Sequence, residues 1–545
     1  MTEISRRALL HRSALLSAGV VVLGTGAACS TSGGAPSGAG KASQLIVIGQ
    51  TLQGFGEDIM LALAPPDKTY WDTIFDYMVA LDAQGHFAPG LATSWDVSAD
   101  HLTWAFDIRE GVKFHNGDDL TVDDLVFSYN RNMFGKGSNN TLIGYAQFTD
   151  SIKADGNKLL VKTKTPVSGV FQWFAQTDGA CGGTVSSEKY FAKVGSKAAS
   201  RAPVGTGPYK FVRINGSQTL ELTAFLDSDR SDWQKARTPA VTNLVITSPD
   251  QESTRLGLLQ TGGADVTPIS ATDISNVSKS GARIVQTPSC TFAGMIYVGY
   301  TLNPKSPFND VRVRQALSMA VDRAGIAKTL YNGTAQPSAA FYGGPNTDGY
   351  PTDLQPVPYD PAKAKALLAA AGYSKLPLQI VTYDEDGDFP GMPTLAEAIS
   401  GYFQNIGLTA PVHVMDHAAL FGEIYAKKLP GQHDNSAVLP ATLELRGFGN
   451  VVDIVPDEVT GYLSTGRVGL FNSPKVDAFL NAASGEFDHA KQNAIIAEYD
   501  RWMAETYSHM PLLASSAVFG VSGKVKSWKP IISQPQASNL WTLTT

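Results

Sequence analysis

LATSWDVSADHLTWAFDIREGVKFHNGDDLTVDDLVFSYNR, residues 91–131, has the pattern of a strand, a turn and a helix in succession. Apolar and polar side chains alternate over residues 102–109, which predicts a half-buried strand. The Asn-Gly pair at residues 116–117 tolerates positive φ and favours a tight turn. Thr121 lies three residues before Asp124, the spacing of a helix capping box, and apolar side chains follow at helical spacing. The stretch therefore predicts a hairpin end followed by a capped helix.

The same stretch gathers four carboxylates around His115. Two of them would lie in the first helical turn, where the helix dipole favours acids, and the other two follow a turn, where Asp is common. No second His or Cys stands near His115 at metal-ligand spacing, so we expect no metal site. An acidic scaffold is the leading interpretation. The alternative is an exported hydrolase that uses a carboxylate pair, such as Asp118 with Asp124, in the manner of a glycosidase.

Length and composition favour a soluble protein with several lobes. The 545 residues exceed what one hydrophobic core usually organises, so two or three lobes are expected. A hydrophobic content of 43% with 17% charged residues is typical of a chain with real cores. The 52 glycines and 30 prolines favour many turns and strand ends. Because strand and helix patterns interleave along the chain, we expect an α/β fold.

Residues 1–28 have the pattern of a signal peptide. Three arginines precede an apolar run over residues 14–23, which is too short to span a bilayer as a permanent helix. The run ends in small residues before Cys29, which resembles a lipoprotein signal whose cysteine is lipidated after cleavage. Residues 29–43 would then be the lipidated cysteine and a flexible tether. An uncleaved anchor and an ordinary secretory signal are the alternatives, and Ser5–Leu10 also resembles a twin-arginine export signal.

Removal of the signal peptide would make the protein more acidic. It takes away three arginines and one glutamate, which changes the formal charge from −7 to −9. An acidic exported protein argues against nucleic acid as a partner. Cys181 and Cys290 are the cysteines other than Cys29. They form either a disulfide, which an oxidising compartment permits, or two buried free thiols.

The opening stretch resembles the signature block of the family 5 extracellular solute-binding proteins, the oligopeptide, dipeptide and nickel receptors of ABC importers. The residues that match are Pro89, Leu91, Ala92, Ser94, Trp95, Arg109, Gly111, Val112, Phe114, His115, Gly117, Asp124 and Ser128, while Leu125 replaces the family's Val. Further stretches are similar to later blocks of the family, in the family's order: 204–211, 309–323, 359–373, 471–483 and 509–513. The matching stretches are spread over nearly the whole length of the chain that would remain after export.

The resemblance implies an α/β, two-lobed periplasmic-binding-protein fold of the venus flytrap type, with an extra domain inserted in the first lobe. The expected boundaries are 44–74, 203–292 and 505–545 for lobe one, 75–202 for the extra domain, and 293–504 for lobe two. Such a protein is an extracytoplasmic receptor that captures a solute between its lobes and delivers it to an ABC permease. We expect a monomer held by its lipid at the outer face of the cytoplasmic membrane, or a periplasmic protein. It would need no cofactor and perform no covalent chemistry.

A peptide is the expected solute, and the candidate cleft residues are Phe55, Trp173, Arg446 and Phe448. Peptide-binding members hold the peptide amine with an aspartate just after a Gly-Trp pair. This chain has Phe448 where that Trp is expected, and its first following aspartate, Asp453, is displaced. Other solutes of the family, such as a metal chelate, an opine or a sugar, therefore stay open.

Overall fold

The computed structural model describes most of the chain from residue 43 onward. The described residues are 43–49, 52, 68–136, 144–176, 183–216, 218–249, 251–341, 343–344, 347–383, 389–415, 420, 441–449, 455–465, 472–534 and 536–545. They all belong to one unit of the chain, which begins at Ala42. The predicted signal peptide, Cys29, Phe55, Cys181 and Asp453 lie outside the described residues.

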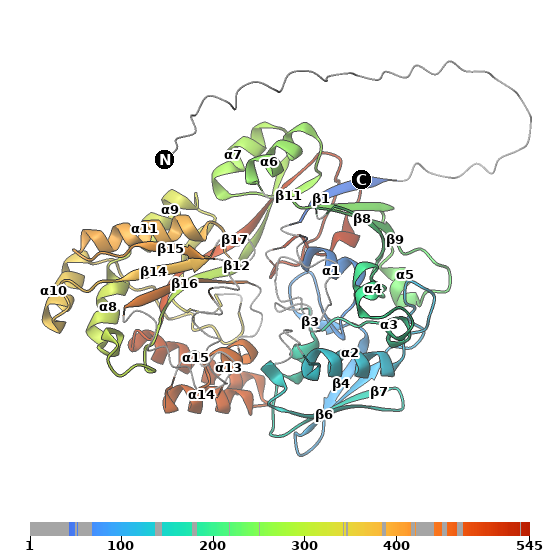
Figure 1. Ribbon diagram of the computed structural model, residues 1–545, viewed down its shortest axis with the longest axis horizontal. Coiled ribbons are helices and arrows are strands. Elements are labelled where there is room, and N and C mark those ends of the chain that lie inside the picture. The colour runs from blue at the N-terminus through green and yellow to red at the C-terminus, as the bar shows by residue number, and fades with distance from the viewer. Residues whose placement is uncertain are drawn as a thin grey trace, which may run out of the picture. The chain divides into compact units, whose positions relative to one another are not determined.

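One sheet of eleven strands connects the larger part of these residues. Its order is β15 (Val412–Met415), β14 (Gln379–Tyr383), β16 (Thr442–Gly449), β12 (Arg283–Tyr297), β17 (Met510–Val521), β11 (Val266–Pro268), β1 (Gln44–Ile48), β10 (Asn243–Thr247), β9 (Thr219–Ala224) and β8 (Tyr209–Asn215), with β13 (Ala335–Pro337) paired to β17. The long strands β12 and β17 run antiparallel through its middle (Figure 1). They link a half that contains β14 to β16 with a half that contains β1 and β8 to β11.

Each half of the sheet has its own hydrophobic core. In the first half, β14 and β16 are buried almost throughout, as expected for parallel strands covered on both faces. The helices of this half are η5 (Pro307–Asn309), α8 (Val311–Met319), α9 (Arg323–Leu330), α10 (Pro361–Ala371), α11 (Met392–Asn405), α13 (Val455–Tyr462), α14 (Pro474–Ser484) and α15 (His489–Glu505). Those of the second half are α1 (Lys68–Ile74), α5 (Asp232–Ala236), α6 (Glu252–Thr261), η4 (Ala271–Asp273), α7 (Ile274–Lys279) and η7 (Leu540–Thr542).

A separate sheet of four strands forms a third core among the described residues. Its order is β4 (Ala92–Val97), β5 (Thr103–Ile108), β7 (Lys158–Thr163) and β6 (Thr149–Asp155), accompanied by the hairpin β2 (Val79–Leu81) and β3 (Phe87–Pro89) and by α2 (Val122–Phe134), η3 (Val170–Phe174), α3 (Glu188–Val194) and α4 (Ser196–Arg201). Buried and half-buried residues alternate along β5, which confirms the predicted half-buried strand. The lobe and domain boundaries given above stay a prediction.

The predicted capping box is present at the start of α2. One carboxylate oxygen of Asp124 accepts hydrogen bonds from the backbone N–H and the hydroxyl of Thr121, both at 2.9 Å. The other oxygen accepts from the backbone N–H of Glu188 at 2.9 Å, at the beginning of α3. Asp124 therefore starts one helix and fixes the beginning of another.

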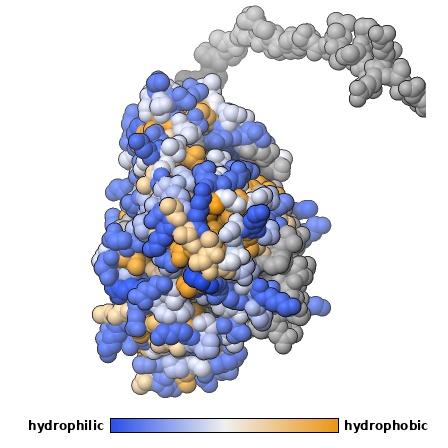
Figure 2. Space-filling view, turned by 90° about the vertical axis from the view of Figure 1, so that its left-hand side faces the viewer, coloured by the Kyte–Doolittle hydropathy of each residue, from blue (hydrophilic) through white to orange (hydrophobic). Residues whose placement is uncertain are grey.

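Most residues of α10 lie at the surface of the first half. Only Ala364 and Leu368 of α10 are buried, and Figure 2 shows that the face of the molecule on this side is mainly hydrophilic, with hydrophobic side chains in small groups. Within the described residues, no helix combines the length and the apolar character that crossing a membrane requires.

Candidate functional site

The carboxyl ends of the parallel strands mark the candidate site. β14, β15 and β16 run parallel in one half of the large sheet, and β1, β10 and β11 run parallel in the other. Open α/β sheets bind ligands outside the carboxyl ends of such strands. Gly449, the last residue of β16, lies opposite Thr291 of β12. β16 therefore ends beside the middle of the strand that links the two halves.

Two predicted site residues lie together at this end of β16. Arg446 and Phe448 share one face of the strand, because successive side chains alternate. The guanidinium carbon of Arg446 is 5.3 Å from the ring centroid of Phe448, within the range of a cation–π contact. Phe341 meets Phe448 edge to face, with 5.0 Å between the ring centroids. The strand end thus combines a cation with an aromatic wall.

The aromatic wall continues from Phe341 to a buried histidine. The Phe341 ring stacks on His509 at 4.1 Å, and Tyr462 meets the same imidazole edge to face at 4.8 Å. Burial lowers the pKa of His509 to about 3, so this imidazole is neutral at physiological pH. Gly294 makes room for the wall, since a Cβ there would lie 2.4 Å from the Phe341 ring.

A buried carboxyl group stands behind this wall. Asp500 of α15, Phe341 and His509 line a cavity of about 10 Å³, which is at the lower limit for one water molecule. Asp500 is 6% exposed, and its Oδ2 atom has no hydrogen-bond partner among the described residues. Burial raises the pKa of Asp500 to about 8, so the group is mainly protonated at neutral pH. The wall is therefore backed by neutral groups.

Trp173, another predicted ligand contact, is not brought to this strand end. Trp173 lies in the core of the four-stranded sheet, where it is 6% exposed and stacks on Tyr145 with a centroid distance of 4.6 Å. Phe55 lies outside the described residues. Contacts of Phe55, Trp173, Arg446 and Phe448 with a ligand all stay predictions.

Cys290 of β12 is a free, buried cysteine in the described part of the chain. Its sulfur lies 3.4 Å from the hydroxyl of Thr287, and burial raises the pKa of the thiol to about 11. Cys181 lies outside the described residues, so the pairing of the two cysteines stays a prediction.

His115 joins the four-stranded part of the chain to the large sheet. Its Nε2 atom is 2.9 Å from the carbonyl oxygen of Gly207, and its backbone N–H donates to the carbonyl of Gly205 at 2.9 Å. The ring also meets Phe225 edge to face at 4.9 Å. Burial lowers the pKa of His115 to about 4. This histidine therefore has a neutral, structural role, and its partner is the glycine-rich stretch at residues 204–211.

Three of the four carboxylates around His115 are engaged in structural contacts. Asp118 accepts from the ammonium group of Lys189 at 2.5 Å, which lowers the pKa of this carboxyl group. Asp119 forms an ion pair of 2.7 Å with Lys113. Asp124 is occupied by the two helix starts. These contacts give Asp118, Asp119 and Asp124 structural roles.

Known proteins resemble this chain over most of its length. Residues 86–435 match the model of the bacterial extracellular solute-binding proteins, family 5. The chain belongs to this family. It is 30% identical over 430 residues to Heme-binding protein A of Haemophilus influenzae, covering 73% of each chain. It is 28% identical over 370 residues to Di/tripeptide-binding protein 2 of Pseudomonas aeruginosa, covering 64% of this chain and 66% of the relative.

A solved structure of the same fold is the periplasmic binding protein DppA from Helicobacter pylori in complex with the peptide STSA. The TM-score is 0.74 at 19% identity, with coverage of 92% of this chain and 98% of the other. The fold is thus the two-lobed fold of periplasmic binding proteins, with β12 and β17 linking the lobes. As a family 5 member, the chain is an extracytoplasmic substrate-binding protein of an ABC transporter.

The sequence reasoning missed four residues of the aromatic wall and its backing: Phe341, Tyr462, Asp500 and His509. His509 begins the last motif that resembles the family, at residues 509–513. That motif was the one signal in the sequence that could have pointed to the wall. The other three stand in turns or helices whose local pattern gives no sign of a site.

Proposed function

We propose that this protein captures a peptide between its two lobes and passes it to a membrane permease. The observation that carries the proposal is the pairing of Arg446 with Phe448 at the carboxyl end of β16, beside the strand that links the lobes. An arginine binds a carboxylate with two parallel hydrogen bonds, and a peptide carries a carboxylate at its end. An aromatic wall at Phe448 and Phe341 suits an apolar side chain next to that carboxylate.

Two of the similar proteins support a peptide ligand. One relative is named a di/tripeptide-binding protein, and one neighbour was solved with a tetrapeptide. The relative named for heme supports a second candidate, a flat apolar chelate that the same aromatic wall would accept. Mass spectrometry of ligand that copurifies with the protein separates these two candidates.

We further propose that the exported protein is held at the membrane by a lipid on Cys29. The motif before Cys29 and the Gly/Ser-rich stretch after it support this, because a flexible tether leaves the receptor free to dock on a permease. Globomycin-sensitive processing and a mass increase of the N-terminal peptide are expected. A chain that starts elsewhere, or carries an unmodified Cys29, would contradict the anchor.

Isothermal titration calorimetry with di-, tri- and tetrapeptides tests the ligand. Replacement of Arg446 with alanine should weaken peptide binding by about 10-fold or more, because a charge-assisted hydrogen bond contributes about 1.5–3 kcal/mol. Arg283→Ala, an exposed arginine on the linking strand, is the matched control and should leave the affinity unchanged. Amidation of the peptide's carboxyl end should weaken binding to the wild type but not to R446A. Equal affinities in R446A and the wild type would overturn the role of Arg446.

A further inference from the structure

A second cavity lies away from the carboxyl end of β16. Its volume is about 280 Å³, close to the lower end of the roughly 300–1,000 Å³ of small-molecule pockets. Its walls come from the end of α1, the β2–β3 hairpin, α5 and the C-terminal segment around η7. The cavity therefore lies between the hairpin that accompanies the four-stranded sheet and the half of the large sheet that contains β1.

One wall of the cavity carries a fixed cation. Arg237 forms a 2.5 Å ion pair with Asp76, and its guanidinium carbon lies 3.9 Å from the ring centroid of Trp233. Thr206 donates to the second oxygen of Asp76 at 2.8 Å. The Nε atom of Arg237 is buried and has no hydrogen-bond partner in the part of the chain that the structure describes. A ligand acceptor in the cavity would satisfy this donor.

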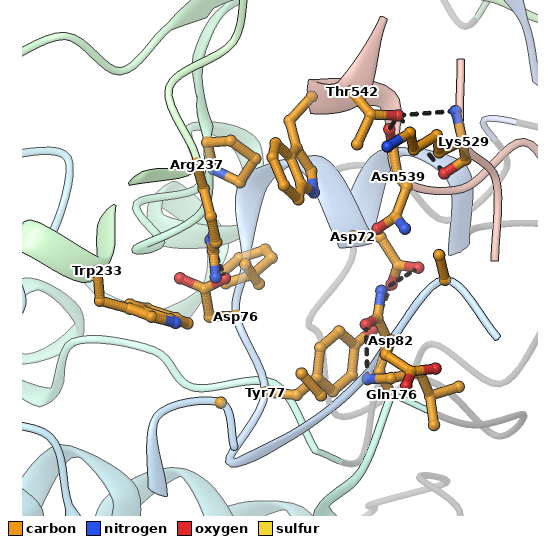
Figure 3. Close-up of a pocket in the computed structure, with 17 residues that line it drawn as sticks. Asp72, Asp76, Tyr77, Asp82, Gln176, Trp233, Arg237, Lys529, Asn539 and Thr542 are labelled. Atoms are coloured by element: carbon orange, nitrogen blue, oxygen red, sulfur yellow. Dashed lines mark hydrogen bonds and ion pairs between the residues drawn. The ribbon is translucent and has the colours of Figure 1, made fainter. Parts of the chain in front are cut away.

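The opposite wall carries a positioned carboxylate. Asp72 accepts from the hydroxyl of Tyr77 at 2.7 Å and from the side-chain amide of Gln176 at 2.9 Å. Figure 3 shows Arg237 and Asp76 on one side of the cavity and Asp72 with Gln176 on the other. The donors from Tyr77 and Gln176 are uncharged and orient the carboxylate of Asp72.

A second cation stands at the rim. The side chain of Lys529 lines the cavity beside Asn539 and Thr542 (Figure 3), and the described residues show no ion pair of its ammonium group. Its backbone is fixed by a hydrogen bond of 3.0 Å from its N–H to the hydroxyl of Thr542. Aromatic rings of Phe75 and Trp541 complete the lining.

We propose that this cavity binds a small zwitterion of amino-acid size, at a site distinct from the interlobe cleft. The carboxylate of the ligand would accept from Arg237 and Lys529, and its ammonium group would donate to Asp72. Its apolar part would pack against Trp541 and Phe75. Because two cations, Arg237 and Lys529, and the carboxylate of Asp72 line the same cavity, it favours a ligand that carries both charges over one that carries a single charge. The proposal goes beyond the capture of a peptide and does not depend on it.

Three probes with six carbons each test the charge requirement: norleucine, hexanoate and hexylamine. Calorimetric titration of the full-length protein should give at least tenfold tighter binding for norleucine than for the other two. Equal binding of hexanoate or of hexylamine would show that a single charge suffices and would overturn the proposal. Absence of norleucine binding at millimolar concentration would overturn it as well.

Variants locate the binding site. Lys529→Met should weaken norleucine binding at least tenfold, whereas Lys526→Met, an exposed neighbour outside the cavity lining, should leave it unchanged. Ala83→Leu places a larger side chain in the cavity and should abolish binding while all the charges remain. Neither K529M nor A83L should alter peptide affinity, and Arg446→Ala should not alter norleucine affinity. Loss of norleucine binding in R446A, or its retention in A83L, would place the ligand elsewhere and refute the proposal.

Discussion

The buried carboxyl group of Asp500 makes a quantitative prediction about stability. Its pKa is about 8 in the folded protein, against an ordinary value of 3.8. Because the folded state keeps a proton that the unfolded state releases, this group's contribution is most favourable below pH 3.8 and is lost as the pH rises towards 8. Each pH unit in this window changes the free energy of unfolding by about 1.4 kcal/mol.

Replacement of Asp500 with asparagine removes this titration. Between about pH 5 and about pH 7 the wild type should lose about 2.7 kcal/mol of unfolding free energy relative to Asp500→Asn. Urea denaturation of both proteins at several pH values measures the difference between their unfolding free energies. The contributions of all other titrating groups cancel in this difference, because both proteins share them. Asp232→Asn, at a fully exposed position in α5, is the control and should run parallel to the wild type. Parallel curves for Asp500→Asn and the wild type would refute the burial argument.

Three further predictions concern the scaffold. Gly205→Ala should lower the free energy of unfolding by about 3 kcal/mol in urea denaturation, because a Cβ there would lie 2.0 Å from the carbonyl oxygen of Ile74. Gly257→Ala in α6 is the control and should be neutral or stabilising, because a Cβ there would have no atom within 4 Å. Cys290 should resist iodoacetamide in the native protein at about pH 8 and react after unfolding, since its thiol is buried and its pKa is raised. The wild type should lose unfolding free energy as the pH falls from 6.5 towards 4, because the unfolded chain binds a proton that the buried His115 does not. His115→Phe should remove this pH-dependent loss. An unchanged pH profile in the variant would contradict the burial of His115.

Local patterns in the sequence predicted local structure well. The alternation around Trp104 and Phe106 became β5, and the spacing of Thr121 and Asp124 became the capping box of α2. Both patterns depend on neighbours within a few residues, so the sequence contains the information directly. The two-lobed α/β fold required the ordered family motifs, because strand order in a sheet such as β16–β12–β17 depends on segments that are more than 200 residues apart.

The site residues were harder to predict from the sequence for the same physical reason. Arg446 and Phe448 were found because they flank a motif that can be compared with the family. Phe341, Tyr462 and His509 come from three separate elements, and each becomes part of one wall only when the chain has folded. The same holds for Asp72 and Arg237, which lie on opposite walls of the larger cavity.

The histidine of the opening motif shows how a chemically rich stretch can serve the scaffold. The family motif around His115 and the glycine-rich motif at residues 204–211 are distant in sequence, yet their backbones and the imidazole are hydrogen-bonded to one another. Gly205 and Gly207 are required because the chain passes directly against Ile74, where no Cβ fits. This contact requires glycine at positions 205 and 207 and a neutral imidazole at position 115, whatever solute the cleft holds. The motifs therefore identify the family, whereas a ligand contact at a side chain such as Arg446 stays a prediction and the solute must be measured.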